Sequence, residues 1–125
     1  MVPPTQMLAT KNRATGKMVS LLAFGVLLAG CMPPGPRALL DGQKLLDAGR
    51  YAQAVDKLLV ATKLPQTKTN AQAWNYLGLA YHRAGQPTNA ATAYRQALAL
   101  NQNLAEARFN LGCLMLEQNK FEAAK

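Results

Sequence analysis

The chain has 125 residues and a formal net charge of +8, and half of its residues are apolar although only 6% are aromatic. This length suits one small domain, and a composition rich in alanine and leucine favours packed helices over strands. The two cysteines, Cys31 and Cys113, form no CxxC motif and no cluster with histidine, which argues against a disulfide framework or a zinc site.

Residues 1–30 have the layout of a secretory signal peptide. Residues 1–17 contain Lys11, Arg13 and Lys17 and no acidic residue, whereas residues 18–30 contain no charge. This uncharged stretch is too short to cross the hydrocarbon core of a bilayer, which takes about 20 residues. A basic flank followed by a short apolar core and small residues is typical of an export signal.

The end of this segment, Leu28-Ala29-Gly30-Cys31, resembles the lipobox of bacterial lipoproteins. The resemblance implies that residues 1–30 are removed and that a diacylglycerol is attached to the thiol of Cys31. Apart from this covalent lipid on Cys31, no cofactor is expected. A soluble signal peptide and an uncleaved short anchor are the alternatives.

The resemblance also implies a place in the cell. Several acyl chains on one residue make membrane attachment effectively permanent. The second residue of the mature chain would be Met32 and not aspartate. By resemblance to sorting in enterobacteria, this favours the periplasmic side of the outer membrane over the inner membrane.

Removal of the leader weakens the case for nucleic acid as a partner. A strongly basic chain normally suggests nucleic-acid binding. From Cys31 onward, however, 11 basic and 6 acidic residues remain, a net charge of +5. An exported protein also meets little nucleic acid, so no nucleic-acid partner is expected.

Residues 31–36 are expected to form the acylated cysteine and a short proline-rich tether. Pro33, Pro34 and Pro36 remove backbone donors and disfavour helical geometry in the residues before them. We therefore expect an extended segment that holds a folded domain, residues 37–125, close to the membrane.

From residue 38 onward the sequence repeats itself. Leu77 and Gly78 recur as Leu111 and Gly112, and Gly49 recurs at a slightly longer spacing as Gly85. A period of about 34 residues is typical of repeats built from two helices. The sequence therefore predicts an array of helix pairs.

Residues 71–104 resemble the tetratricopeptide repeat, a pair of antiparallel helices with the pattern W-x2-L-G-x2-Y followed by A-x3-F. The resemblance implies an all-α solenoid of helix pairs, with repeats at about 35–70 and 71–104 and an incomplete third repeat at 105–125. The residues that match the pattern, and that are expected to shape the fold, are Trp74, Leu77, Gly78, Tyr81, Gly85, Ala90, Tyr94, Ala97, Leu111, Gly112 and Ala124.

The spacing of apolar residues predicts six helices, at about 38–48, 51–63, 70–84, 87–100, 104–118 and from 121 onward. Gly49 and Gly85 suit the left-handed position just past a helix end, and Asn119 fills that role less comfortably. The third repeat lacks most of its second helix and a polar cap. We therefore expect a truncated reading frame or fragment, or another subunit that supplies the missing surface.

The residues show no catalytic or metal-binding pattern. His82 is the only histidine and has no cysteine, aspartate or glutamate at ligand spacing, so we expect an ordinary surface side chain. No glycine-rich phosphate-binding loop joins a strand to a helix. Neither enzyme activity nor a bound metal is expected.

With no catalytic or metal-binding pattern, the expected functional feature is a binding surface on the repeats. In tetratricopeptide repeats the first helices of successive repeats line a groove, and each residue mapped there has the alternative of being an ordinary solvated helix face. The candidate groove residues are Gln72, Asn75, Leu79, His82 and Arg83 from the second repeat and Glu106, Phe109, Asn110, Cys113 and Glu117 from the third.

The expected function is therefore that of a membrane-anchored interaction module, a scaffold or adaptor in envelope assembly that binds a protein or peptide in its groove. Lipoproteins of similar architecture include the pilotins of type IV pilus assembly. Two alternatives stay open. The repeats are the N-terminal part of a longer envelope enzyme, or the module self-associates through its exposed third repeat.

Overall fold

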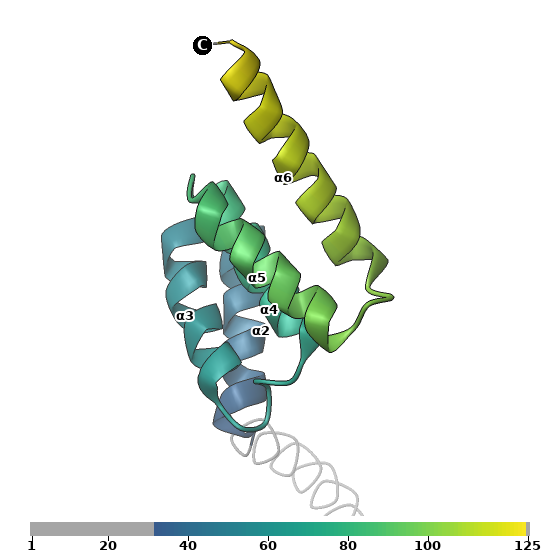
Figure 1. The fold of residues 1–125 in the computed structure, drawn as a ribbon. Coiled ribbons are helices and arrows are strands. Elements are labelled where there is room, and N and C mark those ends of the chain that lie inside the picture. The colour runs from purple at the N-terminus through teal and green to yellow at the C-terminus, as the bar shows by residue number, and fades with distance from the viewer. Residues whose placement is uncertain (1–31, 125) are drawn as a thin grey trace, which may run out of the picture. The chain divides into compact units, whose positions relative to one another are not determined.

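The computed structural model describes residues 32–124, so the expected signal peptide, the lipobox and Cys31 lie outside the described residues. Residues 32–124 form helices and turns without a strand (Figure 1). None of these helices is long and apolar enough to cross a bilayer. The helices are α2 (Pro34–Asp47), α3 (Tyr51–Lys63), α4 (Ala71–Arg83), α5 (Pro87–Leu100) and α6 (Ala105–Ala123).

The helices pack in sequence order. Each one contacts the next along the chain, and the alternate pairs α2/α4 and α4/α6 touch more lightly. Figure 1 shows the first turns of α6 beside α4 and α5 and its last turns clear of them. Contacts limited to near neighbours in sequence are typical of an α-solenoid, which confirms the predicted fold class. The predicted bounds of α3 and α5 are also confirmed.

One glycine reverses the chain within each of the first two helix pairs, as predicted. Gly49 has φ +73° after α2, and Gly85 has φ +79° after α4. The next backbone N–H reaches back into the helix, from Arg50 to the carbonyl oxygen of Leu45 and from Gln86 to that of Tyr81, each at 2.8 Å. This hydrogen-bond pattern satisfies carbonyl groups that the helix ends would otherwise leave without a donor.

Within each pair, a large side chain of the second helix lies on a glycine of the first. A Cβ added to Gly42 would come within 2.5 Å of the Leu58 side chain, and one added to Gly78 within 2.6 Å of the Tyr94 ring. Leu58 and Tyr94 are both fully buried. The glycine in each pair therefore lets the two helices approach, and the large side chain of the second helix fills the space.

Helix α2 begins earlier than predicted, so the expectation of an extended tether is wrong for residues 34–36. The first four N–H groups of a helix have no partner within it, and proline is therefore tolerated there with its φ already suitable. Gly35 is buried, and a Cβ at this position would lie 2.9 Å from Oγ1 of Thr67. Packing against the turn before α4 thus holds the first turn of α2 in place.

The predicted break near Asn119 is also wrong, because α6 is one continuous helix to Ala123. No residue other than glycine has a positive φ within residues 32–124. The left-handed conformation costs a residue with a Cβ about 1–2 kcal/mol. Asn119 is exposed and gains no packing that would offset this cost. Of the residues of α6, Ala107 and Leu114 are buried.

The two equivalent glycines Gly78 and Gly112 offer a matched test of this packing. We expect Gly78→Ala to lower the free energy of unfolding by about 1–3 kcal/mol, because its methyl group overlaps the Tyr94 ring. Gly112→Ala meets no atom within 4 Å and should leave stability unchanged or raise it by up to about 1 kcal/mol through helix propensity. Urea unfolding followed by circular dichroism measures the free energy of unfolding of both variants. Equal effects of the two substitutions would contradict the packing of the Tyr94 ring against Gly78.

Candidate functional site

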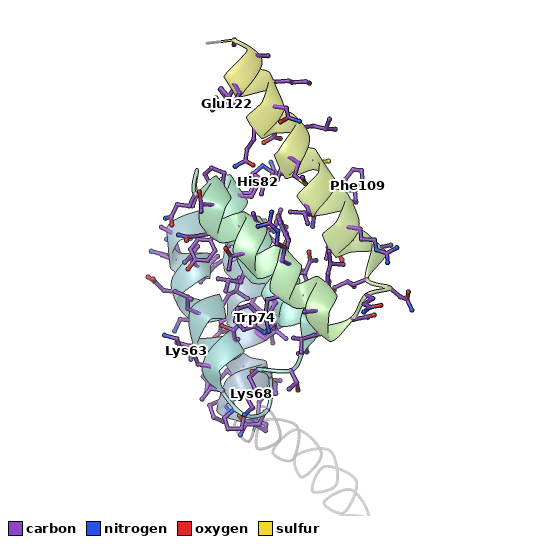
Figure 2. The ribbon with its side chains drawn as sticks, viewed as in Figure 1. Lys63, Lys68, Trp74, His82, Phe109 and Glu122 are labelled. Atoms are coloured by element: carbon purple, nitrogen blue, oxygen red, sulfur yellow. The ribbon has the colours of Figure 1, made fainter. Side chains whose placement is uncertain are left out.

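A cavity of about 430 Å³ lies between α4 and α6. It is lined by Leu79, His82, Arg83, Phe109, Asn110, Cys113 and Glu117. All seven belong to the ten candidate groove residues, so the structure brings most of the predicted set together. In Figure 2, His82 extends from α4 toward α6, and Phe109 stands on the opposite rim, on α6. We call this space the α4–α6 cavity.

Three side-chain pairs join α4 to α6, and in one of them, His82 with Glu117, both residues line the cavity. In each pair the two residues lie about one repeat apart in the chain. The pairs are Gln72 Nε2 to Glu106 Oε2 at 2.8 Å, Asn110 Nδ2 to Asn75 Oδ1 at 3.1 Å, and His82 Nε2 with Glu117 Oε2 at 2.7 Å. These three pairs connect α4 and α6 over most of the length of α4 and hold the two helices at a fixed spacing.

His82 is not the isolated surface side chain that the sequence suggested. Its side chain is 20% exposed and pairs with Glu117, which is 56% exposed. Its partner lies one repeat away in the chain, beyond the short spacing at which ligand residues are recognised in a sequence. Comparing each residue of one first helix with its counterpart one repeat later would have found this pair and the other two.

Three candidate groove residues do not line the cavity. Asn75 is fully buried behind Asn110, and its Nδ2 has no hydrogen-bond partner among the described residues. Gln72 and Glu106 bond to each other at an exposed position instead. The cavity is thus shorter than the predicted groove and ends before the first turn of α4.

A second cavity of about 290 Å³ adjoins the first and was not predicted. Its lining residues are His82, Gly85, Pro87, Leu114, Glu117, Gln118 and Phe121. His82 and Glu117 line both cavities, so their pair forms the wall between them. Sequence reasoning missed this hollow because Phe121 was expected to start another helix.

Tyr94 supports the cavity from the core. It is fully buried and packs with Ala90 and Ala91 of α5 and with Leu114 of α6. Burial raises the pKa of the Tyr94 hydroxyl well above its ordinary value; the Arg83 charge acts in the opposite direction. The hydroxyl oxygen has no hydrogen-bond partner among residues 32–124. The ring, rather than the hydroxyl, therefore holds α6 against α5.

The described residues contain no group of three or more histidine, cysteine, aspartate or glutamate side chains placed to bind a metal. Cys113 is a partly buried free thiol on the cavity wall. The cavity therefore offers two apolar side chains, an amide, a guanidinium and a paired imidazole and carboxylate. This mixture suits the recognition of a peptide, which carries both apolar and hydrogen-bonding groups.

Comparison with known families agrees with this geometry. Residues 71–104 match a tetratricopeptide-repeat model, and residues 93–125 match a second model of the same repeat. The fold of the described residues is an all-α helical solenoid of the tetratricopeptide-repeat type, and the matches place this repeat at residues 71–125. The first match has the bounds predicted for the second repeat, and together the matches cover both helices that line the cavity. No curated protein matches the sequence significantly. Tetratricopeptide repeats are a protein-interaction fold, which makes the repeat region an interaction module.

The Tyr94 hydroxyl is buried and has no hydrogen-bond partner among the described residues, so its removal should not weaken the fold. We expect Tyr94→Phe to keep the stability of the wild type or to raise it by about 1 kcal/mol, because the ring stays and a buried polar group without a partner is removed. In the wild type, the unfolded state ionises above pH 10 while the folded state stays neutral, so stability should fall as the pH rises above this value.

Thermal unfolding of both proteins between pH 7 and pH 11 measures this difference. Other tyrosines contribute equally to both proteins, so only the gap between the two curves reports on Tyr94. A Tyr94→Phe protein that is less stable at pH 7 would show that the hydroxyl has a partner that stabilises the fold.

Proposed function

We propose that the α4–α6 cavity binds a short extended segment of a partner protein. The observation that carries this proposal is that the two first helices of neighbouring repeats line one cavity, and that three side-chain pairs between these helices, at distances from 2.7 Å to 3.1 Å, hold them in place. Such a site is formed before the ligand arrives, and binding then costs little ordering of the protein.

The chemistry of the lining residues suggests what the segment contains. Leu79 and Phe109 offer apolar surface, and Phe109 is 71% exposed. The guanidinium of Arg83 can donate to a carboxylate or a backbone carbonyl of the ligand. A volume of about 430 Å³ is within the range of pockets that bind small ligands and accommodates only a few side chains. We therefore propose a ligand with an apolar residue next to an acidic or carbonyl group.

We further propose that the module acts as a lipid-anchored adaptor in the bacterial cell envelope, on the periplasmic side of the outer membrane. The support for this step is the order of features in the sequence. Three basic residues precede the uncharged stretch 18–30, which ends in Leu28-Ala29-Gly30, and Cys31 and a proline-rich segment follow. An anchor at Cys31 would lie shortly before α2 begins at Pro34. The cavity would then work close to the membrane, where envelope assemblies form.

The peptide-binding proposal is tested with a matched pair of arginines. Random peptides displayed on phage are selected on the full chain, and the affinity of an enriched synthetic peptide is measured by fluorescence anisotropy. We expect Arg83→Ala to weaken binding about 10-fold, in line with the loss of one charge-assisted hydrogen bond. Arg95→Ala removes an exposed charge of the same sign from α5, outside the cavity, and should change binding less than about 2-fold.

Two results would contradict this proposal. If no peptide is enriched over a selection without protein, the cavity does not bind extended segments. If Arg95→Ala weakens binding as much as Arg83→Ala, the peptides recognise the net positive charge of the chain and not this cavity.

The anchor is tested by metabolic labelling with a palmitate analogue in a bacterial host. We expect the wild type and Cys113→Ser to carry the label and to sediment with membranes, and Cys31→Ser to lose both properties, because only Cys31 follows the lipobox residues. An unlabelled wild type, or a label that follows Cys113, would overturn the lipoprotein assignment and leave the peptide-binding proposal standing.

A further inference from the structure

The side of α6 that faces away from the core carries a stripe of four uncharged residues. Ala105, Phe109, Gly112 and Leu116 follow one another at spacings of four, three and four, which places them on one helix face. All four are exposed; Phe109 and Leu116 expose 71% and 63% of their surface. Figure 2 shows Phe109 on the side of α6 that points away from α5. We call these four residues the α6 seam.

Gly112 of this seam occupies the same repeat position as Gly42 and Gly78. Those two glycines are each covered by a large side chain. Gly42 is covered by Leu58, and Gly78 is covered by Tyr94, both from an antiparallel neighbouring helix. A Cβ at Gly112 would meet no atom of the described residues within 4 Å. The structure therefore shows, twice, what covers such a position: a large side chain from a helix that runs in the opposite direction.

The covering helices share a pattern around the large residue. In α3 and α5 a small residue precedes it by four positions and another follows it by three. These residues are Ala54, Leu58 and Ala61 in α3 and Ala90, Tyr94 and Ala97 in α5, and all six are fully buried. Small flanking residues let the covering helix approach until its large side chain reaches the glycine.

Helix α6 carries this pattern itself. Ala105 precedes Phe109 by four positions, and Gly112 follows it by three. The large residue and the open glycine therefore lie on the same face of the same helix. In an antiparallel pair, the seam places a small residue of one copy opposite each large residue of the other, so that two copies are complementary.

We propose that two copies of this chain associate through an antiparallel pairing of their α6 helices about a two-fold axis. Phe109 enters the gap at the second copy's glycine of the seam, and Leu116 covers the second copy's alanine. The symmetry repeats both contacts in the other direction, so that each open glycine is filled. No charged residue belongs to the seam, and pairing therefore desolvates no charge at its centre.

The length of the seam limits the strength of this association. From Ala105 to Leu116 the helix rises about 16 Å, which is short compared with the interfaces of stable dimers. We therefore expect a weak, concentration-dependent dimer, with a dissociation constant in the range of about 10 µM to 1 mM. The dimer uses a face of α6 that the proposed peptide site does not need, apart from Phe109 at their border.

The test is a reciprocal exchange of the large and the small residue. The full chain in non-ionic detergent is measured by sedimentation equilibrium at protein concentrations up to about 1 mM, for the wild type and three variants. Phe109→Ala removes the inserted side chain, and Gly112→Phe fills the gap that receives it. We expect each change alone to weaken dimerisation at least about 10-fold. The double variant restores a large residue opposite a small one and should return the dissociation constant to within about 3-fold of the wild type.

Three outcomes would overturn the proposal. The first is a wild type that stays monomeric at all concentrations. The second is an association that neither single variant weakens, or that the double variant fails to restore, since another surface or another register is then responsible. The third is a loss of helix content or thermal stability in Gly112→Phe at low protein concentration, since another part of the same chain then covers Gly112.

Discussion

The Tyr94 ring lies directly against Gly78 and sets the spacing of α4 and α5. The ring occupies the space of a missing Cβ, so α4 and α5 approach more closely than two helices with ordinary side chains would. The same ring then packs with Leu114, the large buried residue of α6. One aromatic side chain thus fixes the spacing within a repeat and the place of the next repeat, and the α4–α6 cavity exists because both are fixed.

The polar pairs between α4 and α6 fix the position of one helix along the other. Apolar contacts alone tolerate small shifts of one helix along another, whereas Asn75 with Asn110 and His82 with Glu117 match only when the helices are offset by one repeat. The buried amide of Asn75 makes a shift costly, because its oxygen would lose the partner that it has in the core. The cavity walls are therefore held both in distance and in register.

The sequence was sufficient for the parts of the structure that repeat. The recurrence of glycine and leucine one repeat later predicted the helix pairs and the reversals at Gly49 and Gly85. The resemblance to the tetratricopeptide repeat predicted a groove of ten residues, and seven of them line one cavity. The sequence was insufficient where tertiary contacts or their absence decide the local structure. The first turn of α2 forms because Gly35 packs on Thr67. Helix α6 continues through Asn119 because this exposed residue would gain no packing contact that offsets the cost of a left-handed turn. Pairs such as His82 and Glu117 were missed because the residues lie one repeat apart.

Phe109 connects the two surfaces that α6 presents. Its ring lies on the rim of the α4–α6 cavity and also within the α6 seam, and one side chain cannot fill both a peptide site and the gap at the glycine of a second copy. If both proposals hold, peptide binding and self-association are linked. Thermodynamic reciprocity then requires the peptide to weaken the dimer by the same factor by which the dimer weakens peptide binding. A high local concentration of the chain would favour the dimer, and a partner that supplies the peptide would separate the two copies. Helix α6, whose seam is open among the described residues, would in this way act as a switch between a self-paired and a partner-bound form of the module.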